Sequence, residues 1–246
     1  MFELKNLEVT TNIDALVDKL MRFEESIAVP YGFMFGHPYD VFTMLLLDHP
    51  ELMHVAGLLD VTAEREGYAV LHVRYALDQQ EERTKRLDEM EAACAALAES
   101  CANVPYAEKP QRVRDWLLGR AVLVSRHFRE ADSGYAPIVY GLGSPAAFVE
   151  AFQFAAGRLG VPCAPNLGAG EALGGYEPEN PWVEVYGLSG ERDAFLGCVD
   201  IVGDAVRARQ GQPVGAVFHT REEMAGRYGA SHEAVGEYRA LCAGAR

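Results

Sequence analysis

The feature that most constrains the fold is an apolar segment near the middle of the chain with a clear beginning and end. Ser144 precedes Pro145, the arrangement expected when a serine caps a helix and a proline occupies its first position. Gly160 is suited to the left-handed conformation that ends many helices. The pattern predicts a helix from Pro145 to about Leu159 with one apolar face: Phe148, Ala151, Phe152 and Ala155.

The segments before this helix are mostly helical in pattern, and those after it include short strands. Helices are predicted over four earlier segments: 12–25, 39–47, 83–101 and 109–124. An alternating strand is predicted over 68–76, and shorter strands over 182–186 and 195–202, before two helices over 220–228 and 231–242. This order is typical of an α+β fold in which an antiparallel sheet packs against a central helix.

The length and composition permit a full hydrophobic core. The chain has 246 residues, of which 49% are hydrophobic and 24% are charged. Two arrangements fit: one continuous domain, or an N-terminal helical and strand extension over 1–108 packed on a core with C-terminal helices over 109–246.

Charge and cysteine usage limit the partners and the compartment. A net charge of −14 disfavours binding to nucleic acid or to an anionic membrane, and it favours solubility. The N-terminus does not resemble a signal peptide, and the longest apolar run, near 41–47, is too short to span a bilayer. Five scattered cysteines without a CxxC pair predict a cytoplasmic protein with reduced thiols.

No metal or cofactor is predicted. The seven histidines are dispersed and lack metal-ligand spacing, and the glycines near Gly168 do not form a phosphate-binding pattern.

Several separated motifs resemble the transglutaminase-like superfamily, which has a papain-like core. The strongest is the central segment, with Ser144-Pro145-Ala146-Ala147-Phe148, then Ala151-Phe152, then Leu159-Gly160-Val161-Pro162-Cys163. Others are similar to the family in the same order along the chain: Asp48 to Leu52, Asp115 to Leu117, Tyr135 to Gly141, Asn180 to Val185, and Cys198 to Asp200. The resemblance covers about 48–204 and implies a bacterial transglutaminase-like core.

The same resemblance implies that the family's chemistry has been lost. In this family a nucleophilic cysteine opens the central helix, and Pro145 stands at that position. Asn180 stands at the position of the general-base histidine. Only Asp200 matches the third catalytic residue. A proline supplies no nucleophile, so thioester chemistry is expected to be absent.

The candidate site is therefore the ancestral cleft with altered residues. We expect Asp200 and Glu184 to handle protons and Asn180 to replace the imidazole. The expected substrate-binding residues are Tyr135, Tyr140, Ser144 and Trp182. For four of these residues a structural role is also open. Ser144 could be a helix cap, Asn180 a polar group that preserves one hydrogen bond of the lost imidazole, Asp200 a hydrogen-bond acceptor, and Glu184 part of a solvated acidic loop.

Two functions follow, and they belong to different classes. One is a repurposed enzyme of specialised metabolism that acts on an acyl, amide or peptide-like small molecule by acid–base or positional catalysis. The alternative is a catalytically inactive pseudoenzyme that serves as a binding or scaffold protein with a possible protein partner. A displaced nucleophile, Ser144 or Cys198, is a third possibility.

Overall fold

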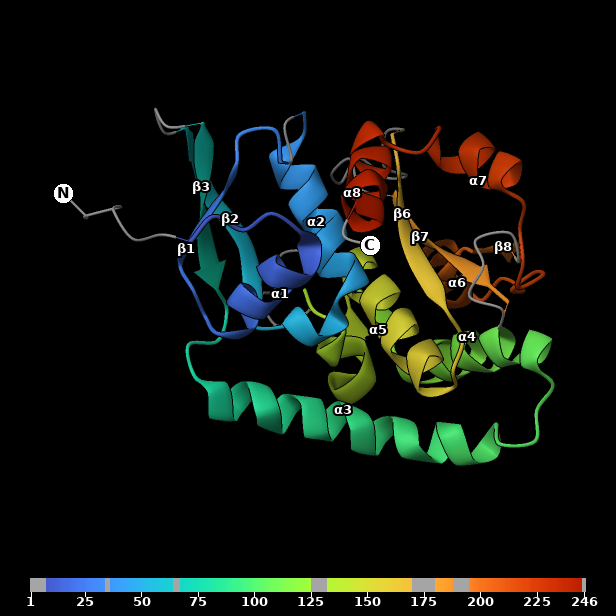
Figure 1. The fold of residues 1–246 in the computed structure, drawn as a ribbon. Helices are drawn as coiled ribbons and strands as arrows, with labels where there is room; N and C mark the ends of the chain where they lie inside the picture. Colours follow the sequence, from blue (N-terminus) through green and yellow to red (C-terminus); the bar gives the residue numbers. More distant parts are fainter. Residues whose placement is uncertain are drawn as a thin grey trace. The chain divides into compact units, whose positions relative to one another are not determined.

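The chain divides into two compact units (Figure 1). The computed structural model describes residues 8–33, 36–63, 67–124, 132–169, 180–187 and 195–244. The first unit comprises residues 1–83 and 233–246, and the second comprises residues 84–232. The sequence suggested a boundary after residue 108, whereas this division falls at residue 83 and assigns the C-terminal helix to the first unit.

The first unit is a three-stranded antiparallel sheet with helices. Its strands are β1 (Ser26–Pro30), β2 (Val55–Ala63) and β3 (Tyr68–Tyr75), in the order β1-β3-β2. Its helices are α1 (Ile13–Met21), α2 (Pro38–Asp48), the short 3-10 helix η2 (Pro50–Leu52) and the C-terminal α8 (Glu233–Gly244). Helix α8 packs on α2, where the Tyr238 hydroxyl donates to Asp48 at 2.9 Å.

The second unit contains the predicted central helix and its sheet. Helix α3 (Gln80–Ser100) leads into it, followed by η3 (Tyr106–Glu108), α4 (Lys109–Arg120) and β4 (Val122–Leu123). The π-helical turn η5 (Ala136–Tyr140) and β5 (Leu142–Gly143) precede α5 (Pro145–Arg158). The remaining elements are β6 (Cys163–Gly168), β7 (Asn180–Tyr186), β8 (Phe195–Val199), α6 (Ile201–Arg209) and α7 (Arg221–Tyr228).

The central helix is confirmed in position, but it is buried on all sides over residues 147–156 rather than on the one predicted face. Ser144 accepts a hydrogen bond from the Ala147 N–H at 3.3 Å, and Pro145 is the first helical residue. Gly160 follows the helix with φ +70°, as the C-terminal pattern predicts. Helix α5 packs on β6 and β7, and the sheet is antiparallel in the order β6-β7-β8. The expected α+β class with an antiparallel sheet is therefore confirmed.

Strands β1 and β2 were not predicted, and α1 ends at Met21 rather than at residue 25. Three further differences have identifiable reasons. The strand predicted over 195–202 ends at Val199, because Asp200 caps a helix that alternating apolar residues had concealed. The helix predicted over 109–124 ends at Arg120, where β4 begins and pairs in parallel with β5. Strand β6 was not predicted because it contains Pro165 and Gly168, residues that sheets tolerate mainly at their edges.

One ionisable side chain lies within the buried surface of the central helix. The Glu150 carboxylate accepts a hydrogen bond from the Gly134 N–H at 2.7 Å. A β-carbon at Gly134 would collide with the backbone of α5, so only glycine permits this close approach. Burial raises the pKa of Glu150 from 4.5 to about 8. The core of the second unit therefore holds a carboxyl group that is mainly protonated at neutral pH.

The substitution Glu150→Gln should stabilise the protein increasingly as the pH rises. An acid whose pKa is higher in the folded state contributes its full stability below its unfolded pKa. As the pH rises further, this contribution to the free energy of unfolding falls by about 1.4 kcal/mol per pH unit until the folded pKa is passed. For Glu150 this window runs from about pH 4.5 to about pH 8. Glutamine keeps the acceptor for Gly134 without the charge, so urea unfolding should show the largest gain at pH 8 and above.

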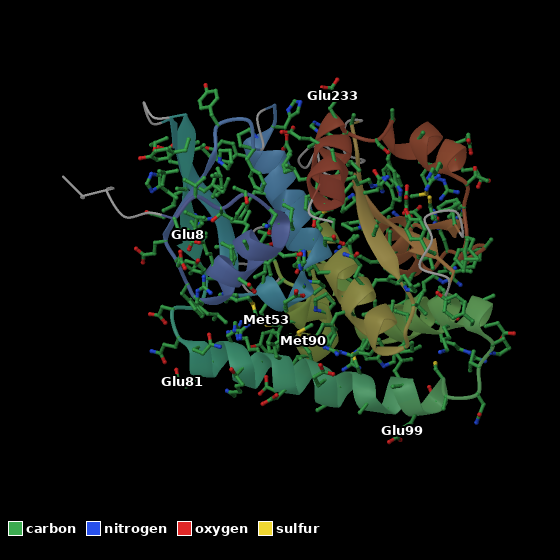
Figure 2. The ribbon with its side chains drawn as sticks, in the orientation of Figure 1. Glu8, Met53, Glu81, Met90, Glu99 and Glu233 are labelled. Carbon is green, nitrogen blue, oxygen red and sulfur yellow. The ribbon has the colours of Figure 1, made fainter. Side chains whose placement is uncertain are left out.

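The matched control is Glu99→Gln on α3, where the side chain is exposed (Figure 2). This variant should follow the wild-type pH profile. Parallel profiles for Glu150→Gln and wild type would show that Glu150 does not titrate in this window.

Candidate functional site

The β6-β7-β8 sheet presents two chemically different faces. Val183 and Val199 are register partners, both buried, and they lie on the face that packs toward α5. Because strand residues alternate, Trp182, Glu184 and Cys198 lie on the opposite face, which we call the outer face. The outer face carries buried polar groups as well as apolar ones, and it is where the predicted acids are found.

A segment of residues 219–231, here the crossing segment, runs over the outer face. At one end His219 pairs with Cys198 of β8, and at the other Ser231 pairs with Gly168 of β6. Since β6 and β8 are opposite edges of the sheet, α7 must cross between them (Figure 1). A β-carbon at Gly168 would collide with the Tyr228 carbonyl oxygen, so the crossing requires glycine there.

Asp200 binds the crossing segment to the rest of the unit. Its carboxylate is 0% exposed and caps α6 by accepting from the Gly203 N–H at 2.9 Å. The same group accepts from the Tyr228 hydroxyl at 2.7 Å and from Arg227 at 2.8 Å, and Arg207 lies at 3.5 Å. Burial, and then the Asp200 charge, raises the pKa of Tyr228, so the phenol donates as a neutral group.

A second buried carboxylate, Asp204, lies one helical turn away. It accepts from Arg207 at 2.5 Å and from Arg114 at 3.4 Å. Burial raises the pKa of Asp204 in spite of these two arginines. The two buried aspartates and their arginines form one ionic network that joins α4, α6 and α7; Arg114 is buried, whereas Arg207 and Arg227 are partly exposed.

Glu184 is also buried and paired. It is 1% exposed and forms a two-pronged ion pair with Arg221, with N···O distances of 3.1 and 3.0 Å. The Asn166 amide donates to it at 3.0 Å, and the Tyr186 hydroxyl donates at 2.5 Å. The Arg221 guanidinium lies 4.0 Å from the centre of the Phe195 ring, and its hydrogen bond to Glu184 raises its pKa. The sequence alternative of a solvated acidic loop is therefore wrong for Glu184.

Trp182 is connected to Asp200 through Tyr228. The indole is 2% exposed and stacks on the Tyr228 ring, with the ring centres 6.1 Å apart. Cys198 and Met224 complete this buried cluster. The structure thus brings Trp182, Glu184 and Asp200 onto one side of the sheet.

Ser144 and the predicted tyrosines lie elsewhere in the unit. Within the described residues the hydrogen bond of the Ser144 hydroxyl stays inside the first turn of α5. Tyr135 is buried, donates to Glu89 of α3 and packs edge-on against Tyr140, with the ring centres 5.0 Å apart. Asn180 begins β7 opposite Gly168, but its side chain lies outside the described residues.

Sequence reasoning missed most of the residues that contact the predicted acids. Arg207, Arg221, Arg227 and Tyr228 surround Asp200 and Glu184, but they come from helices without any motif of the resembled family. One local signal existed: Thr220 and Glu223 form a capping box, which marks the start of α7. It locates the helix, but it does not indicate which strand side chains the helix contacts.

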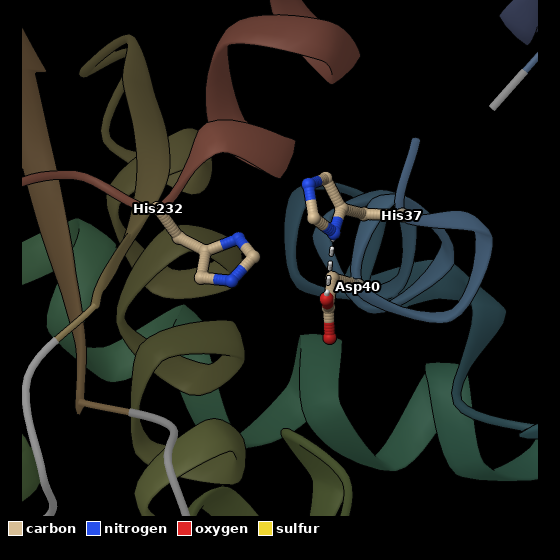
Figure 3. Close-up of side chains that lie close together, drawn as sticks. All are labelled: His37, Asp40 and His232. Atoms are coloured by element: carbon tan, nitrogen blue, oxygen red, sulfur yellow. Dashed lines mark ion pairs between the residues drawn. The ribbon is translucent and has the colours of Figure 1, made fainter. Parts of the chain in front are cut away.

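In the first unit, His37 forms a separate polar cluster with two acids. Its Nδ1 lies 3.8 Å from Asp40, and its Nε2 lies 3.3 Å from Glu233. Figure 3 shows the ion pair with Asp40, and it also draws His232, the last residue of the second unit. These are partly exposed ion pairs, which contribute little to stability.

No family model matches the chain, and no curated protein matches it. No helix in the described ranges is long and apolar enough to cross a membrane.

Asp200→Asn should destabilise the protein by about 2 kcal/mol, because the fully buried carboxylate loses its charge-assisted hydrogen bonds from the Gly203 N–H and the Tyr228 hydroxyl. The measurement is urea unfolding of wild type and variant at neutral pH. Asp115→Asn is the matched control, since Asp115 pairs with Arg114 at 3.1 Å but is 51% exposed. That variant should change stability by less than about 1 kcal/mol. Equal effects of the two substitutions would contradict a supporting role for Asp200.

Proposed function

We propose that the second unit is a transglutaminase-like core that has lost covalent chemistry and now serves as a binding protein. Three features support the family assignment. A helix that begins at Ser144-Pro145 packs on an antiparallel sheet, the strand beginning at Asn180 is central in that sheet, and Asp200 directly follows the next strand. This is the order in which the family motifs occur in the sequence.

The burial and the hydrogen bonds of Asp200 are the observation that supports the proposed loss of catalysis. It is the one catalytic position whose residue type is retained, yet its carboxylate is buried and accepts from a helix N–H, a tyrosine and two arginines. A carboxylate with these donors stabilises the fold and has no remaining role as a proton acceptor. Pro145 and the Ser144 cap provide a stable helix start without a nucleophile.

The proposed ligand is a small or peptide-like molecule, with a protein partner as the other possibility. The net charge of −14 argues against nucleic acid and anionic membranes. None of the five cysteines, all of which lie in the described ranges, forms a disulfide, which supports a cytoplasmic location.

A repurposed enzyme is the second candidate, and one observation favours it. Ionisable groups with altered pKa values gather at the outer face, as they do in active sites. Burial and Arg227 lower the pKa of His219, which leaves it neutral at pH 7 beside the Asp200 network. In this candidate, Glu184 or Asp200 would transfer the proton.

The family assignment can be tested by restoring the two lost residues. The family assignment requires residue 180, the first of β7, to turn toward the start of α5, although Trp182 and Glu184 lie on the outer face. In the double variant Pro145→Cys with Asn180→His, the helix N-terminus and the imidazole should then stabilise a thiolate. Alkylation of the introduced thiol by iodoacetamide at pH 6 should then be about tenfold faster than in Pro145→Cys alone. Peptide mass spectrometry separates this site from the native cysteines.

The matched control is Ala146→Cys with Asn180→His, which moves the thiol by one residue. Its rate should not depend on the histidine. If the histidine also left the thiol of the double variant unchanged, the strand beginning at Asn180 would not face the start of α5. The family assignment would then be wrong.

If the protein is not catalytic, metabolites that co-purify with the wild type should be unchanged after incubation with it. Mass spectrometry of the intact protein should also show no acyl adduct. Turnover would favour the enzyme instead. In that case Asp200→Asn or Glu184→Gln should abolish it, while the exposed Asp115→Asn should not.

A further inference from the structure

We propose that the outer face contains, beneath the crossing segment, a binding site for a neutral carboxamide group. The site consists of the Trp182 indole N–H as donor and the Asn166 side-chain oxygen as acceptor. This inference rests on the proposed binding function and names the chemical group that would be bound.

The first argument is that both atoms are buried without a partner. Trp182 is 2% exposed and Asn166 is 1% exposed, and among the described residues neither Trp182 Nε1 nor Asn166 Oδ1 has a hydrogen-bond partner. Buried polar atoms are nearly always paired in folded proteins, so an unpaired one calls for a cause. A bound polar group is one such cause.

The second argument is that the two atoms are complementary and neighbouring. Asn166 and Trp182 are direct register partners on β6 and β7, so their side chains leave the same face of the sheet. The Asn166 amide is oriented by its bond to Glu184, since Nδ2 donates to the carboxylate at 3.0 Å. Its oxygen is thereby left as an acceptor on the same face of the sheet as the unpaired donor.

The chemistry of this pair selects the ligand. A carboxamide has an oxygen that can accept from Trp182 and an N–H that can donate to Asn166. A carboxylate offers acceptors only, so it would leave Asn166 unpaired and bring a negative charge toward Glu184. The charge of Glu184 is balanced by Arg221, so the site has no net charge that would attract an ion.

The crossing segment supplies the cover. The ring of Tyr228 stacks on the indole, and Met224 is fully buried against it. Arg221, which is 52% exposed, holds the segment to Glu184 from the solvent side. Entry of a ligand requires this end of α7 to separate from β7, after which the segment closes over it.

The indole N–H of Trp182 provides a direct test by NMR. The chain has two tryptophans, so in full-length ¹⁵N-labelled Trp116→Phe the remaining indole signal is that of Trp182. Acetamide should shift this signal with saturation in the range of about 1–100 mM, as expected for so small a ligand. Acetate at the same concentrations should produce no saturable shift.

The matched variant is Asn166→Leu in the same background, which keeps the indole signal and removes the acceptor. It should lose the response to acetamide, and Asn166→Ala gives the same test if leucine does not fold. The proposal is overturned by no shift with acetamide, by equal shifts with acetate, or by a response that survives loss of Asn166. Turnover of metabolites would overturn the non-catalytic role without altering this titration.

Discussion

The second unit depends on a buried carboxylate, that of Asp200, which lies where β8 meets α6 and which also binds α7. Asp200 directly follows β8, caps α6 and accepts from Tyr228 and Arg227 of α7. Burying a carboxylate is costly unless its oxygens are paired, and here each oxygen has its donors. The contacts of Asp200 thereby fix where α6 begins and hold α7 across the outer face.

Glu184, at the centre of the sheet, is another buried acid that holds α7. Glu184 on β7 is held by Arg221 at the start of α7, while Asp200 holds the end of the same helix. The crossing segment is thus fastened near both ends by charged pairs and near both sheet edges by β-bridges. Within this otherwise satisfied polar set, the unpaired atoms of Trp182 and Asn166 stand out, which is why we assign a ligand to them.

The proposed history of the site is one of conversion from chemistry to structure. A proline at the start of a helix and a serine cap give a stable helix where the resembled family has a reactive thiol. The retained aspartate took donors from α6 and α7. In this account Pro145 and Asp200 have a structural use, and binding moves to the outer face.

The sequence by itself determined the elements that rest on local chemistry. These include the Ser144-Pro145 start of the central helix, its glycine end, and the α+β order of segments. Only the tertiary structure decided the surroundings of the acids, because Arg221, Arg227 and Tyr228 are 20 or more residues away from them in sequence. Pattern and propensity act within a few residues, whereas a buried ion pair depends on which helix crosses which strand. For the same reason the sequence concealed α6, whose cap is the aspartate that looked catalytic, and the role of Asn166.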